Sequence, residues 1–136
     1  MKPVRVLTVD DQPVFLMAAR ALIASTPGFV LAGEAGSGAE AISAVERLEP
    51  DLVLLDVRMP GIDGFETARR LADSRVEAVV VLVSGHDIDE IRELAAHSGV
   101  ADVVLKERLR PGLLRRLWAR HGAAVERTEH APHLGP

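Results

Sequence analysis

Short apolar runs alternate along the chain with longer segments in which apolar residues recur at helical spacing. The runs are rich in Val, Leu, Ile and Ala, and we predict a strand in each: residues 4–9, 29–32, 51–55, 78–83 and 100–105. Several of them are nearly continuous aliphatic stretches, which is typical of strands buried on both faces of a parallel sheet. Strict alternation of strands and helices with short connections indicates right-handed crossovers and helices on both faces.

Each predicted helix begins at residues that suit a first helical turn. These are Pro13, Ser37 with Glu40 as a capping box, Gly64, Asp87 with Glu90 as a second capping box, and Pro111. The last helix is predicted to end at Gly122, because glycine commonly follows a helix C-terminus. Residues 123–136 contain prolines, several charges and little hydrophobic periodicity, so we predict a flexible tail or the start of a linker.

Composition narrows the class of protein. A chain of 136 residues fits one domain, and aromatic residues at only 3% leave an aliphatic core. The absence of cysteine excludes disulfides, thiolate chemistry and thiolate metal sites. The formal net charge of -4 gives no general reason to expect direct nucleic-acid binding by this chain. No apolar run approaches the ~20 residues that span a membrane. The N-terminus does not resemble a signal peptide, so we expect a cytoplasmic protein with no membrane contact.

Side chains that can bind a ligand or take part in catalysis follow four of the predicted strands. Asp10 and Asp11 follow the first run, Asp56 the third, Ser84 the fourth and Lys106 the fifth. In a parallel α/β sheet, ligands bind beyond the carboxyl ends of the strands. A single aspartate there is most often an ordinary loop residue, but three carboxylates, a hydroxyl and an ammonium at one edge favour a functional site.

The physics of such a cluster restricts its use. Two carboxylates about 5 Å apart repel by roughly 3 kcal/mol at an effective dielectric near 20, so three of them need a cation. Mg²⁺ suits the site, because it binds one or two carboxylates, keeps several waters and accepts phosphate oxygens. A carboxylate beside the metal is a plausible nucleophile toward phosphorus, with the lysine and hydroxyl neutralising the transferred group. The pattern therefore predicts acyl-phosphate formation on a central aspartate.

Four segments together resemble the receiver domains of two-component systems: VDDQP at 9–13, LLDVRMPGIDG at 54–64, SG at 84–85 and the stretch 99–106. The central segment is the most specific, because MPG and DG follow Asp56 at the spacing of the family. The resemblance covers roughly residues 4–121 and implies a receiver domain over residues 1–122. The implied fold is α/β and flavodoxin-like: a five-stranded parallel sheet in the order 2-1-3-4-5 with helices on both faces.

The resemblance implies that Asp56 is the phosphorylation site in a phosphorelay. A sensor histidine kinase or a phosphotransfer protein is the expected donor, and the reaction is expected to depend on Mg²⁺. Asp11 is the expected main ligand of the metal, Asp10 acts largely through metal-bound water, and Asp56 and the backbone carbonyl of Arg58 complete the set. Such a receiver catalyses its own phosphorylation and dephosphorylation but turns over no separate substrate, so we do not expect the chain to be an enzyme.

Other positions of the family are expected to handle the phosphoryl group. Ser84 is expected to bond a phosphoryl oxygen, and Lys106 to pair with the phosphate or, in its absence, with Asp56. Arg58 and His86, each two residues beyond a site residue, occupy positions that tune how long the phosphate survives.

Three positions depart from the family pattern. Val103 stands where receivers usually carry a switch Tyr or Phe. Glu107 replaces the proline that often follows the lysine, so a trans peptide bond is expected there. Gly85 replaces the usual alanine. These departures concern how phosphorylation is transmitted and leave the acceptor chemistry unchanged.

The sequence does not decide whether the receiver acts alone or controls an output domain of a longer protein. Residues 11–15 and the glycine-rich stretch 33–38 resemble receivers joined to LuxR-type helix-turn-helix domains, so both a free-standing receiver and part of a longer regulator fit. The last helix and the segment before it are basic, which fits a solvated face or a surface for a homodimer or an output domain: Arg108, Arg110, Arg115, Arg116 and Arg120.

Two other classes share parts of the pattern. A phosphohydrolase of the haloacid dehalogenase type also uses a strand-end aspartate with Mg²⁺, but it requires a second aspartate where Arg58 stands. A flavodoxin-like electron carrier shares the fold, yet this chain has few aromatics to sandwich a flavin and completes no phosphate-loop motif.

Overall fold

The computed structural model describes residues 2–74 and 76–130. Its strands are β1 (Val4–Val9), β2 (Phe29–Ala35), β3 (Leu52–Asp56), β4 (Val79–Ser84) and β5 (Asp102–Leu105). Its α-helices are α1 (Pro13–Ala24), α2 (Gly38–Leu48), α3 (Gly64–Asp73), α4 (Ile88–Ala95) and α5 (Pro111–His130), and a 3-10 helix covers Lys106–Arg108. The strands form one parallel sheet in the order β2-β1-β3-β4-β5, which confirms the predicted fold.

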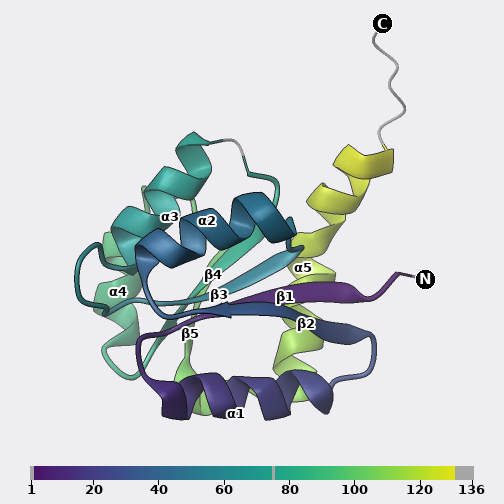
Figure 1. Ribbon diagram of the computed structural model, residues 1–136, viewed down its shortest axis with the longest axis horizontal. Helices are drawn as coiled ribbons and strands as arrows, with labels where there is room; N and C mark the ends of the chain where they lie inside the picture. Colours follow the sequence, from purple (N-terminus) through teal and green to yellow (C-terminus); the bar gives the residue numbers. More distant parts are fainter. Residues whose placement is uncertain (1, 75, 131–136) are drawn as a thin grey trace, which may run out of the picture.

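Helices cover both faces of the sheet, with α1 and α5 on one face and α2, α3 and α4 on the other (Figure 1). Each face has its own buried cluster. The first joins strand residues to Ile23 of α1 and Leu114 of α5, and we call it the α1/α5 cluster. The second joins strand residues to Leu71 of α3 and Ile91 of α4. The sheet is thus buried on both sides, as its continuous apolar runs predicted.

The central strand β3 shows how the sequence fixes the position of Asp56. Leu52 and Leu54 belong to the α1/α5 cluster, whereas Val53 and Leu55 belong to the opposite one. All four are fully buried, and each such side chain contributes roughly 1.5–3 kcal/mol to folding. A slip of one residue would move every side chain to the other face, so the register is strongly determined. Asp56 is therefore held at the carboxyl edge of the sheet.

The edge strand β2 extends to Ala35, beyond the predicted run at 29–32. Gly33 and Glu34 interrupt the apolar pattern, but both pair in parallel with β1. The carboxylate of Glu34 lies 2.8 Å from the guanidinium of Arg20 on α1, at the surface. Backbone pairing thus continues past the last apolar side chain, whereas the bounds of the other strands differ from the prediction by at most two residues.

The helix starts confirm one capping box and correct the other. The amide of Glu40 donates to Ser37 Oγ at 3.1 Å, and the Glu40 carboxylate accepts from the amide of Gly36 at 2.7 Å. The capping box predicted at Asp87 is wrong, because Asp87 has a φ of 54° and its side chain caps no helix amide. A capping residue needs extended backbone, and the left-handed conformation turns the carboxylate toward His86 instead, 3.4 Å away.

The predicted end of the last helix at Gly122 is also wrong, since α5 continues to His130. Gly122 lies in the helix interior without a positive φ, so it does not form the left-handed cap that ends helices. A β-carbon at Gly122 would lie 2.5 Å from the Trp118 ring, so this glycine serves side-chain packing. The division into a receiver over 1–122 and a tail over 123–136 stays a prediction, and residues 131–136 lie outside the described residues.

Candidate functional site

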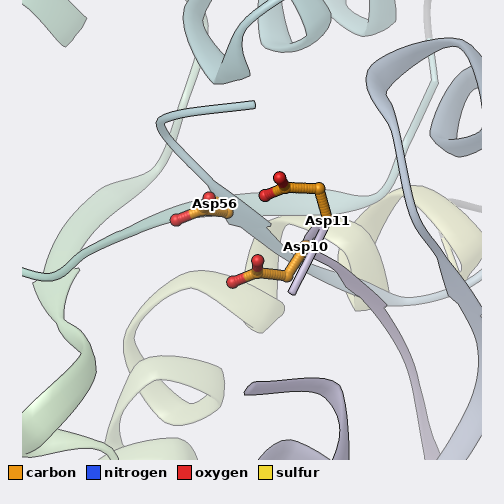
Figure 2. Close-up of side chains that lie close together, drawn as sticks. All are labelled: Asp10, Asp11 and Asp56. Atoms are coloured by element: carbon orange, nitrogen blue, oxygen red, sulfur yellow. The ribbon is translucent and has the colours of Figure 1, made fainter. Parts of the chain in front are cut away.

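Three aspartates meet at the carboxyl edge of the sheet, where β1 and β3 end side by side (Figure 2). Val9 pairs with Leu55, so the residues that follow, Asp10 and Asp56, come to the same level. One carboxylate oxygen from each of Asp10, Asp11 and Asp56 lies within 4.8 Å of the others. Asp10 and Asp56 are buried and Asp11 is exposed. The sequence prediction that these acids converge is confirmed.

Lys106 brings a positive charge to this cluster from the end of β5. Its Nζ lies 2.7 Å from Asp10 Oδ2 and 3.1 Å from Asp56 Oδ1. The contact with Asp56 was expected, and the shorter one with Asp10 was not. Its Nζ also lies 4.5 Å from the centroid of the Phe15 ring on α1. Lys106 is half-buried and its two partners are buried, so the ammonium bridges these carboxylates where solvent screens them less than at the surface.

Burial and like charges act together on the carboxyl group of Asp56. Burial raises the pKa of Asp56, and the negative charges of Asp10 and Asp11 raise it further against the opposing effect of Lys106. For Lys106, burial lowers the pKa, but hydrogen bonds and charges from Asp10 and Asp56 outweigh it and the net pKa is raised. The ammonium therefore stays charged, while ionised Asp56 is destabilised until more positive charge arrives.

The residues present fit a hard divalent cation. Three carboxylates face one ammonium, so the cluster holds more negative than positive charge. Oxygen donors of this kind suit Mg²⁺, which needs few protein ligands and keeps its waters. The amide of Gln12 donates to Asp10 Oδ1 at 2.8 Å, which fixes the direction of that carboxylate.

Ser84 lines the same small pocket as Asp56, and its hydroxyl bonds to the backbone of His86. Its hydroxyl donates to the carbonyl of His86 at 2.5 Å and accepts from the amide of the same residue at 3.3 Å. A small pocket of about 170 Å³ brings both residues together with Asp56, Arg58 and Lys106. The structure thus gathers the predicted phosphate-handling residues around one opening.

Val103 is buried in the sheet core, paired with Leu82 of β4. It also lines a groove of about 620 Å³ between α4 and α5, together with arginines at 92, 108, 110 and 116. No peptide bond among the described residues is cis, so the bond before Glu107 is trans as expected.

Sequence reasoning missed two features near the site. It predicted a helix that begins at Pro13 but did not predict that the Phe15 ring in its first turn contacts Lys106. It also overlooked Thr8, whose Oγ1 is fully buried and has no hydrogen-bond partner among the described residues. Thr8 lies in β1 two residues before Asp10, which directly follows the strand.

The fold and the site together define a flavodoxin-like domain in which a lysine bridges two acidic residues at the carboxyl edge of the sheet. Comparison with known proteins identifies the family of this domain. The chain belongs to the response regulator receiver domain family, whose family model matches residues 6–117. Membership confirms the resemblance drawn from the sequence and places the domain among proteins of two-component signalling.

The curated relatives are longer than this chain. It is 34% identical over 126 residues to the nitrate/nitrite response regulator protein NarL of Escherichia coli, covering 91% of this chain and 56% of that one. It is 41% identical over 90 residues to protein-glutamate methylesterase/protein-glutamine glutaminase 2 of Methanospirillum hungatei, covering 65% of this chain and 25% of the relative. The chain therefore spans between a quarter and about half of these proteins.

Solved structures show the same fold. The receiver domain of the putative response regulator NarL from Mycobacterium tuberculosis superposes with a TM-score of 0.77 at 30% identity, covering 86% of this chain and 98% of that one. A LuxR-family response regulator from Aurantimonas gives a TM-score of 0.76 at 27% identity, with 85% and 81% covered. Within the described residues, no helix combines the length and apolar character needed to cross a membrane.

Proposed function

We propose that the chain accepts a phosphoryl group on Asp56 from a histidine kinase or a phosphotransfer protein, in a Mg²⁺-dependent reaction in the cytoplasm. The observation that carries this proposal is the arrangement at the sheet edge. One carboxylate oxygen of Asp56 lies within 4.8 Å of one from each of Asp10 and Asp11, and the Lys106 ammonium bridges Asp56 to Asp10. A buried carboxylate with charge-neutralising groups beside it is suited to nucleophilic attack on phosphorus.

In the proposed transfer, an oxygen of Asp56 forms a bond to phosphorus as the bond from phosphorus to the donor histidine nitrogen breaks. The electron pair of that bond leaves with the histidine. Asp10, Asp11, Asp56 and the carbonyl of Arg58 would hold Mg²⁺, which supplies positive charge for the phosphoryl oxygens. Lys106 supplies a second positive charge from this chain, and stays protonated because its pKa is raised.

Ser84 would bond a phosphoryl oxygen once its hydroxyl leaves the carbonyl of His86. That exchange breaks the local turn from Ser84 to His86, so the loop before α4 would move with it. Arg58 and His86 are exposed at the rim of the same pocket. From there they would control water access to the acyl phosphate, and with it the phosphate lifetime.

The groove between α4 and α5 is the surface we propose for a homodimer or an output domain. Its lining includes the apolar residues Ile88, Val103 and Leu113 together with four arginines, and no acidic residue is among the lining residues. A partner segment with carboxylates and one apolar side chain would match both features. We propose no direct nucleic-acid binding by this chain, because its formal net charge is -4.

The dependence on Mg²⁺ tests the proposal. The protein is incubated with acetyl phosphate, with Mg²⁺ or with EDTA, and its intact mass is followed over time. We expect the addition of one phosphoryl group with Mg²⁺ and at least a tenfold slower addition with EDTA. Equal labelling in both conditions would contradict the proposed role of the metal.

A further inference from the structure

The ammonium of Lys106 has three neighbours, and only two of them are carboxylates. Asp10 Oδ2 lies 2.7 Å and Asp56 Oδ1 3.1 Å from Nζ, and the centroid of the Phe15 ring lies 4.5 Å away. A cation within about 6 Å of a ring centroid is attracted to the negative face of the ring. An ammonium has three N–H donors, so the ring provides a favourable contact for the side that the carboxylates leave.

The ring of Phe15 is held in place by its own packing. Phe15 lies in the first turn of α1, where its amide donates to the carbonyl of Gln12 at 3.1 Å. Its side chain is partly buried and packs against the α1/α5 cluster. Phenylalanine has only two side-chain torsions, and here the core restricts them. The ring is therefore a fixed surface, whereas the long side chain of Lys106 needs a partner to stay in one place.

We propose that Phe15 is a positioning residue whose ring face holds the Lys106 ammonium over Asp56. The inference deepens the phosphoacceptor function proposed above and depends on it. Asp10 belongs both to the carboxylate set that would hold Mg²⁺ and to the lysine contact, so these two uses compete. The ring takes part in no metal site, and its hold on the ammonium does not weaken when Asp10 is engaged elsewhere.

The consequence concerns rate and leaves the identity of the acceptor unchanged. Lys106 neutralises charge on the phosphoryl group only if its ammonium is aimed at Asp56 when the donor arrives. Without the ring, the ammonium keeps its charge but samples more positions, including ones farther from Asp56 than the present 3.1 Å. Loss of the ring should therefore slow phosphoryl transfer to Asp56 without abolishing it.

The first test replaces the ring with an aliphatic side chain. In Phe15→Leu we expect acetyl phosphate to label Asp56 about threefold to tenfold more slowly than in the wild type, which lies within the range of a cation–ring contact. Phe29→Leu is the matched control. Phe29 packs against the same α1/α5 cluster but lies at the start of β2, beside Val4, at the opposite end of the sheet. A similar slowing in Phe29→Leu would assign the effect to general core loosening.

The second test changes the ring electrons at nearly constant shape. Phenylalanine with one, two or three fluorines is placed at position 15, which progressively removes negative charge from the ring face. We expect the labelling rate to fall with each added fluorine. A flat series with a normal wild-type rate would overturn the proposal, because packing alone is insensitive to ring charge.

A measurement that needs no phosphorylation tests the contact between Phe15 and Lys106 separately from the proposed phosphoacceptor function. The protons beside Nζ of Lys106 should show an upfield ring-current shift in the NMR spectrum of the wild type, lost in Phe15→Leu. A wild type with this shift that never labels on Asp56 would overturn the proposed function while the contact stands. A wild type that labels on Asp56 but lacks the shift would overturn the role of Phe15.

Discussion

Lys106 Nζ lies closer to Asp10, at 2.7 Å, than to Asp56, at 3.1 Å. The lysine therefore balances two buried carboxylates at once, and both of them belong to the set that would bind the metal. Asp11 is the exposed member of the acidic cluster. We therefore expect a division of roles at the sheet edge, in which Asp11 binds the metal ion and Lys106 acts on the phosphoacceptor Asp56.

That division predicts different effects of two alanine substitutions on metal binding. Asp11→Ala should weaken Mg²⁺ binding at least tenfold, because it removes a direct negative charge from a site with few protein ligands. Lys106→Ala should not weaken Mg²⁺ binding, because Lys106 supplies no metal ligand and competes with the metal for Asp10. Titration calorimetry with Mg²⁺ measures both. Equal losses in the two variants would contradict these roles.

The raised pKa of Asp56 predicts a pH-dependent effect of Asp56→Asn on stability. Burial, reinforced by Asp10, puts the folded pKa above the ordinary 3.8, so between the two values the folded state binds more protons than the unfolded state. Stability linked to neutral Asp56 is present below the unfolded pKa and is lost as pH rises through the folded pKa.

Asn at position 56 stays uncharged at every pH, so the variant should escape this loss. We expect Asp56→Asn to be more stable than the wild type at pH 7 in EDTA, with the difference shrinking toward about pH 4. Urea unfolding at both values measures it. A gain that is the same at both pH values would show that ionisation of Asp56 is not its cause.

Activation is predicted to centre on residues 84–88, because Val103 cannot act as an aromatic switch. A hydrogen bond from Ser84 to a charged phosphoryl oxygen is worth about 1.5–3 kcal/mol, enough to shift a loop equilibrium by one or two decades. Val103 is buried and has a single, β-branched torsion. Asp87, with its φ of 54°, lies in the same loop and adopts a left-handed conformation that is uncommon for residues other than glycine.

The measurement compares amide NMR shifts with and without beryllofluoride, a mimic of the phosphoryl group. Large changes should run from Ser84 into α4, with little response at Val103. Ser84→Ala is the variant in which the loop response should largely disappear. A response centred on Val103 with a quiet loop would refute this account of activation.

Thr8 gives a prediction for stability. Its buried hydroxyl has no partner among the described residues, and an unsatisfied buried hydroxyl costs about 1–3 kcal/mol. Thr8→Val keeps the shape and removes the polar atom, so the free energy of unfolding should rise by roughly 1 kcal/mol. Urea unfolding tests this, with Thr26→Val as a control, because Thr26 is also buried but donates to the carbonyl of Leu22 at 2.7 Å. The control should lose stability.

The sequence was most informative where local pattern determines structure. Aliphatic runs identified the strands, and because parallel strands end at one edge, they also predicted that Asp10, Asp11, Asp56 and Lys106 converge. It was least informative where distant packing decides. Gly122 lies inside a helix with the Trp118 ring against it, which the general association of glycine with helix ends did not predict, and the contact of Phe15 with Lys106 joins residues far apart in the chain.

The measurement that tests the central claim most directly is the location of the phosphoryl group after reaction with acetyl phosphate and Mg²⁺. Peptide mass spectrometry should find one group, on Asp56, in the wild type and none in Asp56→Asn. Asp63→Asn is the matched control, since Asp63 caps α3 at Glu66 and asparagine can keep that bond. It should label like the wild type. Normal labelling of Asp56→Asn on another acid would contradict the claim that Asp56 is the phosphoacceptor.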